Sequence, residues 1–456
     1  MWPALTYALG LLERYFTSCY SLRLYINVGL TGYYSGSHST SLQSTIFSAL
    51  AIVVQQHPVL STVFINESPS KIFYGRLPEI DLSKIVTFVQ RQKPYTGAGA
   101  DLELDGLLEK QHDTGFEEMN GTAPFWRLMI LTDSTASPKP SFAATFICHH
   151  SVGDGVSVVA FHKSFLAALQ TINGSLSSTI VQSPKTPMLP TVEDVLKMPV
   201  SAKHFLKKVS SELFLPTSKN LWIAEPIKVL TTSHFQSVVI SPGITSSFVA
   251  RCKENDTTVT ATIQTVIAAA LFQLLPTKFS TLQCNLSVSL RRWLPDPINE
   301  KSIGCWASTV EEHYSRQAFS WNEARRTRQT TLKYLSSSAK NDVVGMLRFL
   351  PNLHAFAKAQ IGKNRSSSFE VSNVGVFKAD MEGNNWQLGR MVFSQSAFAN
   401  ESAFTVSVVT GADGSCVFGF TWPEGIVESD LMEKLIVMVS NDVEELADHG
   451  SLSREA

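Results

Sequence analysis

The sequence lacks several features that would each point to a different class of protein. It has no basic excess: 38 Lys and Arg stand against 39 Asp and Glu, a formal net charge of -1. A nucleic-acid-binding protein needs a basic face to neutralise phosphates, so this balance argues against one, although it leaves room for a local basic patch that binds one phosphorylated ligand. No stretch approaches the roughly 20 apolar residues that a membrane-spanning helix needs.

Cysteine is also sparse. The six cysteines are scattered over 456 residues and none forms a Cys-x-x-Cys pair, so neither a zinc site nor a redox motif is expected. This usage fits a reducing compartment better than a disulfide scaffold. We therefore expect a cytoplasmic protein, and leave open a peripheral contact with the endoplasmic reticulum or lipid droplets. The sequon Asn120-Gly121-Thr122 is then interpreted as a chance match.

The chain instead offers ample material for a core, with 44% hydrophobic and 17% charged residues. The N-terminal stretch Leu5–Tyr20 has no basic start and is interrupted by Glu13 and Arg14. It is interpreted as an amphipathic helix and not as a signal peptide. Further periodic segments indicate helices and strands, listed here in chain order: strand 22–34, helix 41–56, strands 60–65, 125–131 and 142–148, helix 156–169, strand 235–240, helices 244–253 and 259–274, strand 282–290, helix 321–335, strands 370–376, 386–394, 403–409 and 416–422, and helix 431–446.

Helices and strands are mixed in both halves without strict β-α-β alternation, which predicts an α+β fold of two similar domains. The stretch Thr171–Leu189 holds an Asn-Gly pair, several Ser and Thr, and prolines, so it is the best linker candidate. We predict an N-terminal domain at residues 1–175, a linker and crossover at 176–225, and a C-terminal domain at 226–456.

One run carries recognisable chemistry: His149-His150-Ser151-Val152-Gly153-Asp154-Gly155, after an apolar strand and before a helix. A neutral imidazole can accept a proton from an alcohol if it is held in the right tautomer. Gly153 and Gly155 are expected to permit the turn that orients His150, because glycine adopts dihedrals barred to other residues. Asp154 is placed either to orient the imidazole or to pair with a distant Arg. The alternative is that the two histidines only end a strand and Asp154 caps the next helix.

This run matches the H-H-x-x-x-D-G signature of the coenzyme A-dependent acyltransferase superfamily, which includes chloramphenicol acetyltransferase, nonribosomal peptide condensation domains and the plant BAHD acyltransferases. More narrowly, the chain resembles the fungal alcohol acetyltransferase family. The blocks that carry this resemblance span almost the whole chain in order: Leu9–Phe16, Tyr25–Val28, His57–Leu60, Pro124–Leu128, Ser289–Pro295, Ser372–Gly375 and Phe393–Ser396. The D-F-G-W-G segment of the plant relatives is missing, and Tyr7-Ala8 stands where an Arg often precedes the opening Leu-Gly.

The resemblance implies two chloramphenicol acetyltransferase-like domains, each a mixed sheet flanked by helices, with the active site in a channel between them. It implies that His150 is the base, that His149 and Gly155 belong to the motif, and that Asp154 pairs with Arg291, with Arg292 as the fallback. Acyl-CoA, most simply acetyl-CoA, would be a cosubstrate. No permanently bound cofactor and no metal are expected.

Other residues are weaker candidates. Ser372, Asn373 and Ser394 end apolar strands, where a donor could stabilise the charge that develops on the thioester oxygen; as alternatives, each bonds locally in a turn. Basic residues near the mouth of the site would suit the phosphates of coenzyme A, and the candidates are Lys358, Lys363 and Arg365, which could equally be a solvated helix end. Cys148 is interpreted as a packed apolar residue and not as a nucleophile.

The leading hypothesis is an O-acyltransferase that moves an acetyl group to a small-molecule alcohol, such as a hydroxyl of a fungal secondary metabolite, by direct general-base catalysis. We expect a monomer. Two alternatives remain: a condensation-like or cyclisation enzyme on the same fold that acts without coenzyme A, and a non-catalytic binding module. The intact motif argues against the binding module, and the lack of a carrier domain in the 456 residues weakens the condensation version.

Overall fold

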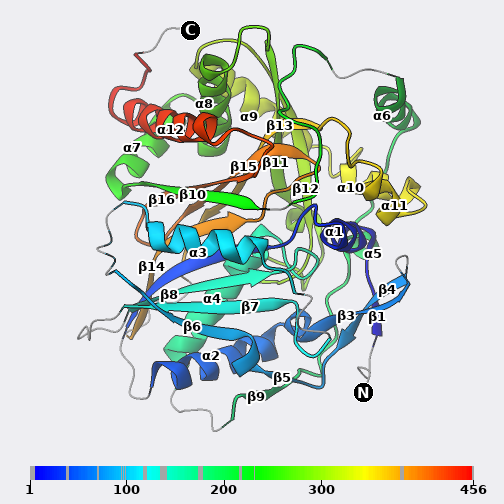
Figure 1. Cartoon of the computed structure of the whole chain (residues 1–456), viewed down its shortest axis with the longest axis vertical. Coiled ribbons are helices and arrows are strands. Elements are labelled where there is room, and N and C mark those ends of the chain that lie inside the picture. Colours follow the sequence, from blue (N-terminus) through cyan, green and yellow to red (C-terminus); the bar gives the residue numbers. More distant parts are fainter. Residues whose placement is uncertain are drawn as a thin grey trace.

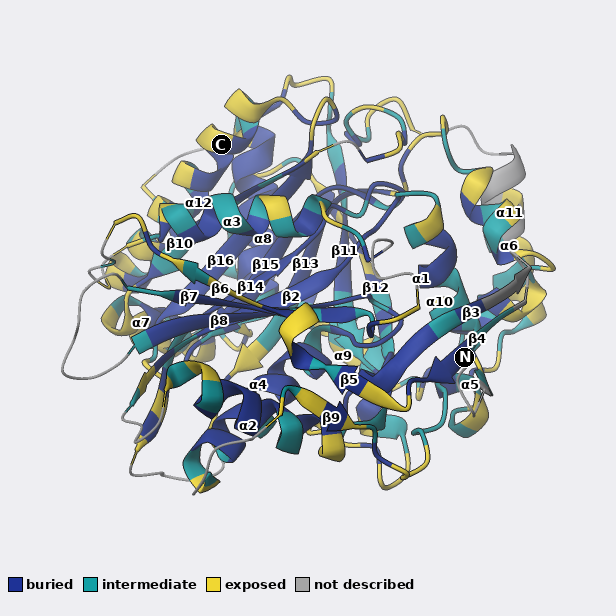
Figure 2. Cartoon of the chain, turned by 60° about the horizontal axis from the view of Figure 1, so that its bottom comes forward, coloured by how far each residue is buried: buried dark blue, intermediate teal, exposed yellow. Residues whose placement is uncertain are grey.

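The computed structural model describes residues 6–36, 41–68, 71–93, 95, 97, 99–116, 121–133, 141–172, 178–214, 218–230, 232–379 and 385–453. They form two layered lobes that lie one above the other in Figure 1, each built around one sheet. The predicted α+β class with two mixed sheets is confirmed. Figure 2 shows that the strands of both sheets are mostly buried, whereas exposed residues gather on outer helices and loops.

The sheet of the lower lobe has five strands in the order β14-β2-β8-β7-β6. Only the pair β6–β7 is parallel. Two apolar helices pack together in its core, where they bury side chains such as Phe161 and Val53. The elements are β2 (Val28–Gly36), β6 (Val86–Gln90), β7 (Trp126–Thr132), β8 (Ser141–Cys148), β14 (Trp386–Gln395), α2 (Leu42–Gln56) and α4 (Gly155–Thr171).

The sheet of the upper lobe has six strands in the order β10-β16-β15-β13-β11-β12, with parallel pairs at β13–β15 and β11–β13. Helices α7, α8 and α12 cover one of its faces and form a second core. The elements are β10 (Ser233–Ile240), β11 (Thr281–Ser289), β12 (Ala307–Ser315), β13 (Ser367–Val376), β15 (Ser402–Thr410), β16 (Cys416–Pro423), α7 (Pro242–Glu254), α8 (Val259–Leu274), α9 (Trp321–Leu335) and α12 (Ser429–His449).

The two lobes exchange elements. Strand β14 belongs to the second half of the sequence but pairs with β2 of the lower sheet, with Phe393 opposite Leu30. Helix α3 (Leu102–Asp113) belongs to the first half but lies against β10, where Ser237 donates a 2.8 Å hydrogen bond to Asp105. The boundaries at residues 175 and 225 remain a prediction about the sequence, and the structure shows that contacts cross them.

Smaller elements complete the molecule. Helices α1, α5, α10 and α11 contribute to a third apolar cluster that contains Phe16, Tyr25 and Trp306, whereas Ile80 of β5 and Val181 of β9 belong to the core of the lower lobe. The remaining elements are β1 (Thr6–Ala8), β3 (Thr62–Ser68), β4 (Lys71–Arg76), β5 (Glu79–Asp81), β9 (Ile180–Gln182), α1 (Leu11–Ser21), α5 (Val192–Val195), α6 (Ala202–Phe214), α10 (Val343–Met346) and α11 (Leu353–Lys358), with short 3-10 turns at Pro58–Ser61, Leu82–Lys84, Arg291–Trp293 and Leu347–Phe349.

Most predicted segments are present with shifted ends. The predicted N-terminal helix is shorter, because a strand that pairs with β4 precedes α1. The strand predicted from Leu22 begins only at Val28, since the chain turns at Arg23, whose φ is +52°. The linker stretch Thr171–Leu189 contains β9, which pairs with β5. Asn120 of the sequon lies outside the described residues.

Among the described residues, no single helix is both long and apolar enough to cross a membrane, and α7 and α8 satisfy the test only as a pair bent by 96°.

Candidate active site

The histidine motif forms the turn between β8 and α4. Strand β8 ends at Cys148, and the amides of Val152 and Gly153 both donate to the carbonyl of His149, at 2.9 and 3.3 Å. The carboxylate of Asp154 then accepts a 2.9 Å hydrogen bond from the Ser157 amide, so Asp154 is the N-cap of α4. A strand end, a bonded turn and a capped helix together hold the motif in one place.

Asp154 also joins the two halves of the chain. Its two oxygens accept hydrogen bonds from both terminal nitrogens of Arg291, at 2.8 and 2.9 Å, and the amide of Trp306 donates to it at 2.9 Å. Both side chains are almost fully buried. Burial raises the pKa of this carboxyl, but Arg291 and the backbone donors outweigh burial and hold the pKa below its ordinary value. The expected pairing with Arg291 is thus present, whereas Arg292 is exposed beside Trp293.

Gly153 and Gly155 were expected to permit the turn through backbone dihedrals that other residues cannot adopt, and this expectation is wrong. Neither Gly153 nor Gly155 has a positive φ, so neither is required by its dihedrals. Close packing is the reason instead. A Cβ atom on Gly155 would lie 2.9 Å from Val374 and 3.2 Å from Phe393, and one on Gly153 would lie 2.9 Å from the Cβ of Ser157. Gly155 therefore lets the start of α4 approach β13 and β14.

The imidazole of His150 is half-buried in an aromatic setting. The ring of Phe16 from α1 stacks on it with 3.9 Å between centroids and 11° between planes. The ring of Tyr25 lies 5.3 Å away, and Sγ of Cys305 lies 3.8 Å from Nδ1. Sequence reasoning did not identify these three neighbours, although Phe16 and Tyr25 fall within blocks that resemble the family.

The surroundings favour the neutral form of His150. Burial lowers its pKa to about 4, against smaller raising effects of the Asp154 charge and of a hydrogen bond to its own backbone carbonyl. A proton on Nδ1 would leave the lone pair of Nε2 free to accept a proton. This tautomer is the one that a base acting through Nε2 requires.

His149 faces a different environment. Its Nδ1 accepts hydrogen bonds from the amide and the hydroxyl of Ser151, at 3.0 and 2.8 Å. The ring is buried between Tyr20 and Phe64. Burial, reinforced by His150, lowers its pKa to about 3. His149 is therefore a packed, neutral residue that holds the turn, and we assign it no part in proton transfer.

The three polar candidates on strand ends differ in what they contact. Asn373 is engaged locally, since its amide donates to Thr260 at 2.9 Å and its oxygen accepts from the Gly375 amide at 2.8 Å. Ser372 is buried on β13. Ser394 is fully buried on β14, and its hydroxyl has no hydrogen-bond partner among the described residues. Ser394 is thus the candidate with an unused donor.

The basic candidates separate into two groups. Lys358 and Lys363 are exposed at and after the end of α11. Arg365 is buried and donates to the backbone carbonyls of Glu225, Ala399 and Ser402. Burial lowers its pKa to about 10. Arg365 is therefore less accessible to a phosphate of coenzyme A than the two lysines are, and its binding of a phosphate stays a prediction.

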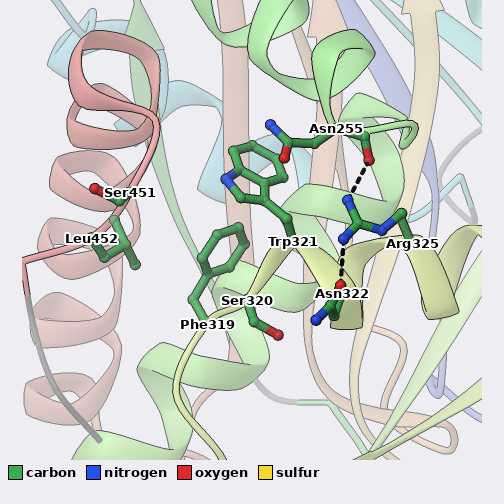
Figure 3. A pocket seen from close by; sticks show the side chains of 8 residues that line it. All are labelled: Asn255, Phe319, Ser320, Trp321, Asn322, Arg325, Ser451 and Leu452. Atoms are coloured by element: carbon green, nitrogen blue, oxygen red, sulfur yellow. Dashed lines mark hydrogen bonds between the residues drawn. The ribbon is translucent and has the colours of Figure 1, made fainter.

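A surface hollow lies elsewhere. It has a volume of about 400 Å³ and is bordered by Trp321 at the start of α9 and by Leu452 after α12 (Figure 3). None of the predicted site residues lines it. In the part of the chain that the structure describes, no three His, Cys, Asp or Glu side chains are grouped to hold a metal ion.

The two mixed sheets and the buried histidine turn that is braced between them are typical of an acyltransferase. The family model for alcohol acetyltransferases matches residues 8–443, and the chain belongs to that family. It is 33% identical over 457 residues to the probable alcohol acetyltransferase crmB of Aspergillus fumigatus, covering 93% of this chain and 96% of that one. It is 23% identical to the probable alcohol acetyltransferase FCK4 of Fusarium pseudograminearum, covering 94% and 93%. The protein is accordingly an acyltransferase.

Solved structures share the fold at low identity. The trichothecene 15-O-acetyltransferase TRI3 of Fusarium sporotrichioides superposes with a TM-score of 0.70 at 14% identity, over 97% of this chain and 94% of that one. The first condensation domain of the calcium-dependent antibiotic synthetase gives 0.66 at 11% identity, over 99% and 98%. These likenesses confirm the predicted fold class.

Proposed function

We propose that this acyltransferase moves the acetyl group of acetyl-CoA to the hydroxyl of a small-molecule alcohol, with His150 as the general base. The observation that carries this assignment is the placement of the imidazole: Phe16 stacks on the ring, and burial lowers its pKa to about 4, which favours the neutral form that can accept a proton. Family membership supports the reaction type, and the four hydrogen-bonded partners of the Asp154 carboxylate support a rigid site: Arg291, Ser157 amide and hydroxyl, and Trp306.

The proposed steps balance without a metal or a covalent enzyme intermediate. Nε2 of His150 takes the proton of the alcohol while the alcohol oxygen attacks the thioester carbonyl carbon. The carbon–sulfur bond then breaks, and the imidazolium returns the proton to the departing thiolate. The products are an acetyl ester and coenzyme A. A donor is needed for the oxyanion, and we propose the free hydroxyl of Ser394 for it.

The proposal also covers the acceptor, the compartment, the oligomeric state and the residues that bind the phosphates of coenzyme A. The acceptor would be a hydroxyl of a fungal secondary metabolite, and the protein would act as a cytoplasmic monomer. All six cysteines are unpaired, which supports a reducing compartment. Lys358 and Lys363 are the more accessible candidates for the phosphates of coenzyme A, because both are exposed.

The test is turnover by the purified protein, measured as release of free thiol from acetyl-CoA with a panel of alcohols. His150→Ala should lower the rate by about 10²–10⁴-fold, the usual contribution of a positioned base, while the melting temperature changes little. Near wild-type turnover in that variant would contradict the assignment. Acetylation only from a carrier-bound thioester, with no release of coenzyme A, would instead favour the condensation-like alternative.

A further inference from the structure

The upper sheet has two chemically different faces, and both are largely buried except at the edge strand β12, where Glu311 opposite Asn285 is exposed. On one face, apolar side chains pack against α7, α8 and α12; they include Leu282, Cys284, Leu286, Phe369, Val371, Phe404, Val406, Phe418 and Phe420. The other face carries mainly polar residues, with Asn285, Glu370, Thr405 and Thr421 side by side in one row across four strands. Phe235, Val409 and Val417 of this second face belong to the core of the lower lobe, so it faces that lobe.

This polar row is buried and only partly bonded. Asn285 and Glu370 are each 5% exposed, and Thr421 is fully buried. Ser287 donates a 2.6 Å hydrogen bond to Oε1 of Glu370. Within the described residues, however, Oε2 of Glu370, Oδ1 of Asn285 and Oγ1 of Thr421 have no partner. Burying polar atoms without partners is costly, and native proteins satisfy most of them with protein, water or ligand.

Hydrogen bonds link Tyr25, a neighbour of the base, to the strand β15 that carries Thr405 of the row. The Tyr25 ring is 5.3 Å from His150, and its hydroxyl donates to Gln395 at 2.9 Å. The amide of Gln395 in turn donates to Ser407, the neighbour of Thr405 on the same face of β15. Glu370 is close enough that its charge raises the pKa of Tyr25. These contacts connect the surroundings of His150 with β15, where Thr405 lies opposite Glu370 of β13.

The acidic side chains at the row are suited to bind a neutral hydroxyl group. Burial raises the pKa of Glu370 to about 7. Tyr15 and Asn285 contact a second acid, Glu401. Burial and the nearby charge of Glu370 raise the pKa of Glu401 to about 8. Such acids stay largely protonated below neutral pH and then both donate and accept hydrogen bonds, as an alcohol does. Two buried acids repel anions, so the phosphates of coenzyme A do not fit here.

We propose that Asn285 and Glu370 form an acceptor subsite that binds a second hydroxyl group, several bonds away from the hydroxyl that is acetylated. The substrate class is thus a diol or polyhydroxylated alcohol and not a simple alkanol. This inference rests on the proposed function, because it places the reacting hydroxyl at His150.

The probes are the primary alkanols from butanol to decanol and the corresponding terminal diols. Two readouts are taken with each: the shift in melting temperature on binding, and the release of thiol from acetyl-CoA. The wild-type protein should prefer at least one diol over its matched alkanol. Glu370→Met, which removes both oxygens at similar volume, should reduce that preference about tenfold, the effect of one lost hydrogen bond to a buried group. Asn285→Leu should act in the same direction, and Glu370→Gln should retain part of the preference.

Glu312→Met is the matched control. Glu312 is also 5% exposed and lies on β12 of the same sheet, but opposite Cys284, that is, on the helix-covered face. Its loss should leave the diol preference unchanged. A wild-type protein without diol preference in binding, or variants at Glu370 and Asn285 that keep the full preference, would overturn the subsite. Diol-selective binding without any thiol release would instead leave the subsite standing and remove acetyl transfer from coenzyme A.

Discussion

Asp154 faces Arg291, 137 positions further along the chain, and not the imidazole of His150 that precedes it by four residues. Both oxygens of the carboxylate already accept hydrogen bonds from other groups, so the carboxylate has little capacity to bond to the imidazole of His150. The Asp of the motif therefore braces the turn, and it does so by joining α4 of the lower lobe to the short turn Arg291–Trp293 that follows β11.

This arrangement predicts that Asp154→Asn lowers both stability and rate. Removing one partner of a buried ion pair typically costs about 3–5 kcal/mol, because the remaining charge stays buried. Denaturant unfolding and turnover should therefore both change. An unaltered unfolding curve with lost activity would show that Asp154 acts on the imidazole directly.

The Arg91–Asp101 pair provides a matched control. Its side chains are 3% and 6% exposed, and Asp101 caps α3 just as Asp154 caps α4. Asp101→Asn should lower stability to a similar degree while turnover per folded molecule stays near wild type. Equal loss of turnover in both variants would mean that general destabilisation, and not the position of the motif, explains the effect.

The pH dependence of the rate should reflect the depressed pKa of His150. The base is competent only when neutral, and its pKa of about 4 means that protonation removes activity near pH 4 and not near 6.5. The measurement is kcat/KM against pH at saturating acetyl-CoA. An acidic limb centred near 6.5 would contradict the buried, neutral state of the ring.

Stability should respond over an overlapping pH range. Burial lowers the pKa of His112 and His149 to about 3 and of His162 to about 4. The unfolded chain takes up protons near pH 6.5, before the folded one does, so these groups reduce stability progressively as the pH falls from about 6.5 towards 3–4. They contribute nothing above pH 6.5. An unfolding free energy that stays constant between pH 6.5 and 4.5 would contradict the burial of these histidines. The loss of stability at low pH is separated from the loss of catalytic rate by short assays in which the fraction of folded protein is also measured.

Gly155→Ala should destabilise the contact between the lobes. The added Cβ would lie 2.9 Å from Val374, tighter than real contacts allow, and overpacking of this kind costs about 1–3 kcal/mol. Gly106→Ala is the control. Gly106 also lies in a helix, α3, but its Cβ would meet nothing within 4 Å, so that change should be neutral or stabilising. Val374→Ala should partly rescue Gly155→Ala, and an additive double variant would show that the two sites do not touch.

Features that depend on neighbouring residues could be predicted from the sequence, whereas features that depend on contacts between distant residues could not. The strand and the helix around the motif follow from local signals, an apolar run and a capping Asp, whereas Gly155 is explained by packing against distant residues. The pairing of Asp154 with Arg291 came only from resemblance to the family, since nothing local selects one Arg among many. The stacking of Phe16 on His150 has no sequence signal at all, because it depends on where α1 docks.

The missed elements have similar explanations. Strand β12 carries alternating Thr, Glu and His at a sheet edge, and the polar alternation was overlooked although its period of two is clear. Helix α3 contains Gly106, which weakens the helical pattern in the sequence although the helix continues through it. The position of β14 in the lower sheet could not be predicted, since strand pairing across more than 300 residues leaves no trace in local periodicity.

The order in which the substrates react depends on whether Cys305 acts as a nucleophile. The structure places this thiol 3.8 Å from Nδ1 of His150, whereas the thiol of Cys148, the cysteine considered from the sequence, points to the carbonyl of Gly153. Burial raises the pKa of both thiols far above the ordinary value, and only a thiolate attacks a thioester readily. No acyl-enzyme should form, so varying acetyl-CoA and alcohol in turn should give intersecting double-reciprocal lines, as for a ternary complex, and Cys305→Ala should stay active. Parallel lines, with a mass increase of one acetyl group on the protein that disappears in Cys305→Ala, would replace general-base catalysis with a covalent route through Cys305.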